Sequence, residues 1–238
     1  MSPSAPKTAM VLAAGLGTRM RPLTDDRPKA LVEVGGRPLI DHMLDRLGHA
    51  GVQTAVVNVH AFADRLEQHL KARRWPRIVI SDERPQALET GGGLKHAIPL
   101  LGNGPVWVCN IDSVWIEQGG ASAMEAMAGA WNPDAMDVCL MVAPTSTSLG
   151  FHDTGDLFLE PDGAVRFKKP GESAPYVYVG VHICDPAIVA DGPAGPFGLL
   201  PTWKDLAKTR RVHGVAPPGL WMHVGDPAAR DAAEARLR

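Results

Sequence analysis

Short apolar segments recur along the first part of the chain, and most of them are rich in valine, isoleucine or methionine. They cover residues 9–14, 54–59, 77–80, 106–111 and 137–142. Their apolarity is continuous rather than alternating, which is typical of strands buried on both faces of a sheet. The segments between them have helical periodicity, at residues 39–50, 62–72, 93–101 and 121–131. This alternation predicts an α/β fold, with a mostly parallel central sheet flanked by helices.

After Pro144 the pattern changes to short strands separated by turns. Strand-like runs stand at 157–160, 164–167 and 176–184, with turn sequences such as Pro161-Asp162-Gly163 between them. A helix with Asp205 and Lys208, strands near Val212 and Trp221, and a helix from Pro227 follow. We therefore expect one Rossmann-like domain over 1–238. Its parts are a core at 8–143, an added β-rich lobe at 144–215 closing over one edge of the sheet, and a closing strand and helix at 216–238.

Charge and cysteine usage narrow the classes of partner. The 238 residues include 24 Lys and Arg and 26 Asp and Glu, so the net charge of -2 gives no overall field that would attract nucleic acid or an anionic membrane. The three cysteines are far apart and lack paired metal-ligand spacing. No apolar run approaches the roughly 20 residues of a membrane span. We expect a cytoplasmic protein with neither nucleic acid nor membrane as a partner.

The first apolar run stops at a glycine turn, in the sequence "LAAGLGTRMRPLT". In parallel α/β sheets ligands bind beyond the carboxyl ends of strands, and Gly15 and Gly17 let the backbone approach a phosphate closely. A plain glycine turn is the alternative. A dinucleotide fingerprint is excluded because Met20 stands at its third glycine position, and the Gly-Lys-Ser/Thr of a P-loop is absent.

Cations follow these glycines instead, at Arg19, Arg21 and Lys29. One guanidinium group can bind two phosphate oxygens at once, and an ammonium acts as a point charge. The loop is therefore suited to a polyphosphate. The stretch "LAAGLGTRMRPLTDDRPKALVEVGGRPLI" resembles the signature of the sugar-1-phosphate nucleotidyltransferases. The resemblance implies their glycosyltransferase-A-like fold, with Arg19 on the β- and γ-phosphates and Lys29 near the α-phosphate. It also implies a nucleotide-binding loop made of Leu12, Ala13, Ala14, Gly15, Gly17, Thr18 and Arg19.

A second glycine cluster, "ETGGGLKHA", precedes a predicted helix. Helix N-termini favour anions, and three consecutive glycines leave space for a flat base or a sugar against the backbone, although a flexible loop would have the same composition. The cluster resembles the base-facing loop of the family, which implies nucleotide contacts from Glu89, Gly91 and Gly92. Its sequence is closest to the branch that joins UTP to N-acetylmuramate 1-phosphate.

The strand "VWVCNIDSVW" ends in Asn110 and Asp112. A strand-end aspartate is often only a helix cap. In the family this aspartate holds Mg²⁺, which prefers hard oxygen ligands, so the resemblance implies a metal at Asp112 and a sugar-phosphate contact from Asn110. Near the end of the chain, "GLWMHVGDPAAR" resembles the closing element that supplies a second metal ligand. Here that position is His223, a poor ligand for Mg²⁺ but a reasonable one for Mn²⁺, and Asp226 is the alternative.

Two further segments resemble the sugar side of the family's site. In "VRFKKPG" the matching lysine, Lys169, is implied to bind the sugar phosphate together with Lys29, while Lys168 replaces the family's glutamate. A basic pair before proline is otherwise usually a solvated turn. In "YVGVHI", Gly180 is expected to leave room for an acyl substituent on the sugar.

The resemblance implies nucleotidyl transfer from a nucleoside triphosphate to a sugar 1-phosphate, giving a nucleoside diphosphate sugar and pyrophosphate. UTP, N-acetylmuramate 1-phosphate and a place in cell-wall sugar recycling are the expected specifics, with Mg²⁺ or Mn²⁺ as cofactor. Arg19, Lys29 and Asp112 are the expected catalytic residues. Thymidylyl, guanylyl or cytidylyl transfer is the alternative, as is a catalytically weak nucleotide or sugar-phosphate sensor. We expect a monomer or a small homo-oligomer.

Overall fold

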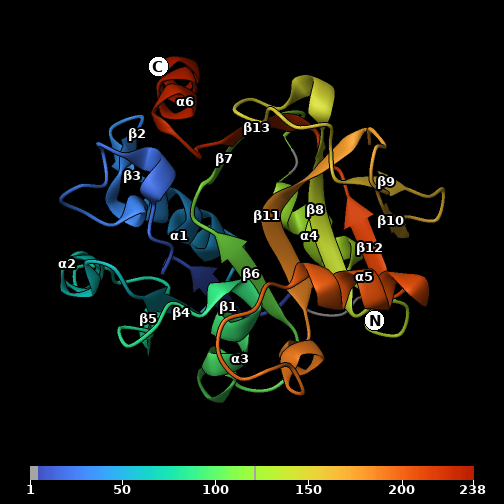
Figure 1. The fold of residues 1–238 in the computed structure, drawn as a ribbon, viewed down its shortest axis with the longest axis horizontal. Coiled ribbons are helices and arrows are strands. Elements are labelled where there is room, and N and C mark those ends of the chain that lie inside the picture. Colours follow the sequence, from blue (N-terminus) through green and yellow to red (C-terminus); the bar gives the residue numbers. More distant parts are fainter. Residues whose placement is uncertain (1–4, 121) are drawn as a thin grey trace.

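The computed structural model of the protein describes residues 5–120 and 122–238 (Figure 1). A nine-stranded sheet forms its centre. Four neighbouring strands, which run from inside the sheet to one of its edges, are parallel and stand in the order β6–β1–β4–β5: Val106–Asn110, Thr8–Leu12, Thr54–Val59 and Arg77–Asp82. These are apolar runs of the sequence, so the predicted fold class, an α/β fold with a mostly parallel central sheet, is confirmed.

The strands after Pro144 continue this sheet rather than closing over its edge. β11 (Tyr176–Cys184) pairs antiparallel with β6 and with β8 (Val138–Pro144). Beyond them lie β9 (Leu157–Leu159), β10 (Val165–Phe167) and β12 (Val212–Val215). β11 therefore brings the second half of the chain directly against β6, whose carboxyl end holds Asn110.

Helices cover both faces of the sheet. One face packs on α1 (Leu39–His49), α2 (Ala63–Leu70) and α4 (Ala123–Ala130), and the other on α3 (Glu89–Leu101) and α5 (Leu200–Lys208). Neighbouring residues of one strand alternate between the two cores, as expected for the two-residue period of a strand: Val11 joins the first and Met10 the second. The helix predicted at 121–131 is observed from Ala123, and Ala121 itself lies outside the described residues.

The strand expected near Trp221 and the helix expected from Pro227 are both observed, whereas the strand at 113–117 and several shorter elements were not predicted. β7 (Ser113–Glu117) pairs with β13 (Gly219–His223) as a separate two-stranded sheet, and β2 (Glu33–Val34) with β3 (Arg37–Pro38). The 3-10 helices are η1 (Thr18–Met20), η2 (Lys29–Leu31), η3 (Thr145–Thr147) and η4 (Pro186–Val189), and α6 (Pro227–Leu237) ends the chain. Over residues 5–120 and 122–238, no helix combines the length and the apolar character needed to span a bilayer.

Candidate active site

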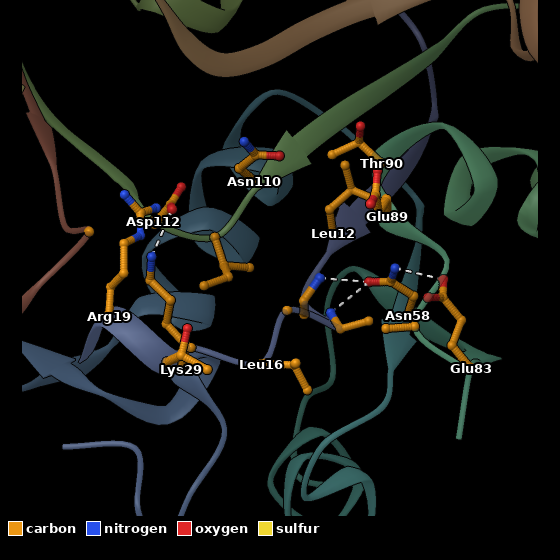
Figure 2. Close-up of a pocket in the computed structure, with 18 of the residues that line it drawn as sticks. Leu12, Leu16, Arg19, Lys29, Asn58, Glu83, Glu89, Thr90, Asn110 and Asp112 are labelled. Carbon is orange, nitrogen blue, oxygen red and sulfur yellow. Dashed lines mark hydrogen bonds and ion pairs between the residues drawn. The ribbon is translucent and has the colours of Figure 1, made fainter. Parts of the chain in front are cut away.

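A cavity of about 600 Å³ lies at the carboxyl ends of the parallel strands (Figure 2). Most of the predicted site residues line it: Leu12, Ala13, Ala14, Gly15, Gly17, Thr18, Arg19, Lys29, Glu89, Asn110 and Asp112. They come from four separate places in the sequence. The parallel order of β4, β1 and β6 brings those places together at one sheet edge, because the carboxyl ends of parallel strands share that edge.

Hydrogen bonds with the neighbouring strand β4 fix the conformation of the loop after β1. The Asn58 Oδ1 atom accepts hydrogen bonds from the backbone N–H groups of Ala13 (2.6 Å) and Ala14 (3.1 Å). Gly17 adopts the left-handed region with φ 64°, where glycine is favoured, and the Thr24 hydroxyl donates to its carbonyl at 2.8 Å. The loop is therefore preorganised, and it leads directly into η1 and Arg19.

Cations and a carboxylate share one end of the cavity. Lys29 sits on η2, and its Nζ atom donates to Asp112 Oδ2 at 2.8 Å. Burial raises the pKa of Asp112, but the Lys29 ammonium and the nearby His223 ring outweigh this effect, so the carboxyl pKa lies below its usual value. Arg19 is exposed and forms no ion pair within residues 5–120 and 122–238. At this end of the cavity, Arg19 and Lys29 can together bind an anion while the Asp112 carboxyl stays ionised.

The β7–β13 sheet places His223 beside Asp112. Ser113 pairs with His223 in that sheet, and the Val224 N–H donates to the Asp112 carbonyl at 2.8 Å. His223 Nδ1 lies 3.9 Å from Asp112 Oδ2. Asp226 is instead the N-cap of α6, since its Oδ1 accepts the Ala229 N–H at 2.8 Å.

A divalent cation fits this end of the cavity only if substrate supplies most of its ligands. The described residues contain no group of three His, Cys, Asp or Glu side chains that could hold a metal. Mg²⁺ is commonly held by one or two carboxylates plus phosphates and water, and Asp112 provides one carboxylate. The donor set therefore suits an ion that enters with a polyphosphate.

The opposite end of the cavity lies at the start of α3, where Figure 2 shows Glu89 and Thr90 near Leu12 and away from Arg19. Glu89 adopts φ 60°, a left-handed conformation that is uncommon for a residue with a side chain. Backbone strain of this kind is concentrated at functional sites. Glu89 is exposed and forms no ion pair within residues 5–120 and 122–238, so its carboxylate is available to the part of a ligand farthest from the cations.

Two buried polar residues that line the cavity were not predicted from the sequence, Asn58 and Glu83. Each is 2% exposed. Asn58 Nδ2 donates to Glu83 Oε1 at 2.8 Å, and Glu83 Oε2 accepts the Leu88 N–H at 2.9 Å. The pair thus joins the loop after β1 to the turn before α3. Both residues stand near the ends of parallel strands, as Asn110 does, and that position alone could have identified them.

Gly91 and Gly92 do not line the cavity, and the space beside them is filled by protein. α3 begins at Glu89 rather than at 93, and both glycines lie in its first turn. Their N–H groups donate to the Phe197 carbonyl at 2.8 and 3.1 Å. A side chain on Gly91 would overlap the Phe197 ring, and one on Gly92 would come within 2.6 Å of the Gly195 carbonyl oxygen. Because these two residues have no side chain, the 195–197 segment packs directly against them, and no space remains there for a base.

Gly180 also fails to leave room for a substituent. It stands at an irregularity of β11 with φ 81°, and an added Cβ would lie 3.0 Å from the side chains of Asn110 and Ser113. Lys169 lies in a second cavity, of about 570 Å³, between the loop after β10, β11 and α5. The structure therefore separates Lys169 from the cavity that contains Lys29 and Asp112.

Comparison with known proteins agrees with this geometry. Residues 9–152 match the MobA-like NTP transferase domain. The chain belongs to that family. It is 73% identical to an N-acetylmuramate alpha-1-phosphate uridylyltransferase of Caulobacter vibrioides, with 98% of each chain covered. It is 35% identical to an enzyme of the same name from Neisseria meningitidis, covering 95% of this chain and 96% of the relative. The resemblance to the sugar-1-phosphate nucleotidyltransferases is confirmed.

Solved structures share the fold at low sequence identity. The inositol-1-phosphate CTP transferase of T. maritima superposes with a TM-score of 0.77 at 18% identity, covering 98% of this chain and 96% of that one. A UDP-glucose pyrophosphorylase from Acinetobacter baumannii gives 0.76 at 18% identity, over 97% and 92%. At such identities the likeness supports the fold class alone.

Proposed function

We propose that the protein transfers a uridylyl group from UTP to N-acetylmuramate 1-phosphate, releasing pyrophosphate. The observation that supports the reaction class is the meeting of Arg19, Lys29 and Asp112 in one cavity at the strand ends. The substrates are those in the name of the relative that is 73% identical over nearly the whole chain. The same proposal assigns the protein to cell-wall sugar recycling in the cytoplasm.

In this reaction an oxygen of the sugar phosphate attacks the α-phosphorus, and the bond from that phosphorus to the bridging oxygen of the β-phosphate breaks. The attacking group is already an anion, so no protein nucleophile is required, and positioning and charge neutralisation provide the catalysis. Arg19 would bind the departing pyrophosphate and Lys29 the α-phosphoryl group. Lys169 would neutralise the acceptor from the neighbouring cavity.

Asp112, together with the phosphate oxygens, would hold Mg²⁺, with His223 as a further donor that suits Mn²⁺ better. A bound ion would supply positive charge for the phosphates in addition to the lysine and arginine. A bound ion would compete with the Lys29 ammonium for the Asp112 carboxylate, so Lys29 would be released to contact the α-phosphate. Glu89 and Thr90, at the far end of the cavity, would contact the nucleoside.

The test is a panel of the four ribonucleoside triphosphates and dTTP against several sugar 1-phosphates, followed by pyrophosphate release with Mg²⁺ and with Mn²⁺. We expect the fastest release with UTP and N-acetylmuramate 1-phosphate, and none with Asp112→Asn at unchanged thermal stability. Faster release with another triphosphate would correct the nucleotide. Binding of UTP without release for any pair would identify a sensor and contradict the proposal.

A further inference from the structure

The second cavity contains an unusual number of lysines. Three of them, Lys168, Lys169 and Lys204, line it together with an aromatic wall of Phe167, Tyr178 and Trp203. We propose that this lysine cavity receives a carboxylate on the acceptor sugar, and that Lys168 and Lys204 select acidic over neutral sugar phosphates. The inference rests on the proposed function, because it concerns the acceptor of that reaction.

Lys168 is positioned but not neutralised. Its Nζ atom lies 3.0 Å from Thr154 Oγ1 and 3.5 Å from Asp153 Oδ1. The Lys168 side chain is 26% exposed, whereas that of Asp153 is 69% exposed, so the counter-charge is in water and the pair is weak. An ammonium has three donors. Lys168 therefore keeps charge and hydrogen-bonding capacity for a ligand.

The carboxylates of the lysine cavity are already engaged elsewhere. Glu172 Oε2 accepts from Arg166 Nη1 at 2.9 Å and from the Lys169 N–H at 2.8 Å. Asp156 Oδ2 accepts the Tyr178 N–H at 3.0 Å, and burial raises the pKa of Asp156 above its ordinary value despite the opposing effect of the nearby Lys168 ammonium. Within residues 5–120 and 122–238, Lys204 forms no ion pair. The cavity thus has an excess of positive charge.

Residues close together in the sequence line the lysine cavity and the first cavity, an arrangement that would let one sugar phosphate reach both. Tyr178 lines the lysine cavity, and two residues further along β11 Gly180 packs against Asn110, which lines the first. Two residues of a strand span roughly 7 Å, about the width of a hexose ring with one substituent. Pro196 and Leu200 likewise line the first and second cavities from one short segment.

The aromatic wall explains why the acceptor would be an acylated acid rather than a simple anion. Tyr178 and Trp203 stack edge to face with ring centroids 5.0 Å apart, which gives a fixed apolar surface. An acetylated sugar with a carboxylate on an ether side chain, as N-acetylmuramate has, presents apolar and anionic groups together. N-acetylglucosamine 1-phosphate is the same acceptor without the carboxylate, and it is therefore the matched probe.

The experiment compares kcat/KM for these two acceptors, with UTP saturating, in the wild type and in Lys168→Met and Lys204→Met. Lys208→Met is the control, since Lys208 is exposed, pairs with Asp205 and does not line the cavity. We expect kcat/KM of Lys168→Met and of Lys204→Met to fall about tenfold for the acidic acceptor, which is the size of one charge-assisted hydrogen bond. For the neutral acceptor it should fall less than about threefold, and Lys208→Met should match the wild type. Lys168→Glu should reverse the preference.

Equal losses on both acceptors, or no loss on either, would overturn the inference and leave the proposed function intact. A wild-type enzyme that uses the two acceptors equally well would also overturn it, while nucleotidyl transfer would stand. If the wild type releases no pyrophosphate with either acceptor, the proposed function itself fails, and the inference fails with it.

Discussion

The link between Asn58 and Glu83 can be tested by exchanging the amide and the carboxylate. In the wild type, Asn58 Oδ1 accepts two backbone N–H groups of the phosphate loop and its Nδ2 donates to Glu83 at 2.8 Å. Asn58→Asp would keep the acceptor but place a second carboxylate oxygen against Glu83. Both side chains are buried, at 2% exposure, so the repulsion would be poorly screened.

The magnitude follows from the protonation needed to relieve that repulsion. A carboxyl with a pKa near 4 takes up a proton at pH 7 at a cost of about 1.36 kcal/mol per pH unit, or about 4 kcal/mol. The cost falls to about 1.4 kcal/mol at pH 5, so Asn58→Asp should lose most of its instability on acidification. Adding Glu83→Gln should restore stability at pH 7. The oxygen of the introduced glutamine would then accept the Leu88 N–H, and its amide would donate to the carboxylate introduced at position 58.

Urea unfolding of the wild type, of Asn58→Asp, of Glu83→Gln and of the double variant, at pH 7 and at pH 5, measures these free energies. The KM for UTP reports on the loops that line the cavity. We expect the KM to rise more than kcat falls in Asn58→Asp, and to recover in the double variant. Additive destabilisation by the two substitutions, or an effect independent of pH, would refute the reasoning.

Four further results are expected. Lys29→Met should lower kcat for pyrophosphate release at least about a hundredfold, as for other groups that stabilise transition-state charge, without loss of helical circular dichroism. His223→Asp should lower the Mg²⁺ concentration needed for half-maximal activity, and an unchanged requirement would show that His223 does not face the ion. Burial lowers the pKa of His182 to about 3, whereas a histidine in the unfolded chain has a pKa of about 6.5. His182 therefore takes up a proton on unfolding at any pH between these two values. The contribution of His182 to stability should then fall by about 2 kcal/mol between pH 7 and pH 5, so the loss of stability over that range should be smaller in His182→Gln. Burial raises the pKa values of the thiols of Cys109, Cys139 and Cys184. These thiols should therefore react with a thiol reagent only after unfolding.

The sequence is most informative where local chemistry and fold agree. Continuous apolar runs predict the parallel strands, and the strand-end positions of Asn110 and Asp112 predict that they lie at the same edge as the glycine loop; the structure brings them into one cavity with Arg19. Sheet order explains this success, because any polar residue just after a parallel strand reaches that edge whatever its neighbours are.

Predictions that depend on tertiary contacts could not be made from the sequence. The glycines before α3 have the composition of a ligand loop, yet Phe197, distant in sequence, fills the space beside Gly91. The sequence predicts room for a substituent at Gly180, and that room is occupied by Asn110. The role of Asn58 depends on a partner, Glu83, that follows the neighbouring strand β5. Local pattern indicates that a glycine or an amide is required, but not which neighbour requires it.

The central claim is that the cavity joins a uridylyl group to the phosphate of an acidic amino sugar. ³¹P NMR of UTP and N-acetylmuramate 1-phosphate with the wild-type protein and Mg²⁺ tests it most directly. The account predicts loss of the sugar monophosphate resonance, with a new diphosphate diester and pyrophosphate appearing in equal amounts. Persistence of the sugar phosphate, with UTP intact or hydrolysed to orthophosphate, would contradict it.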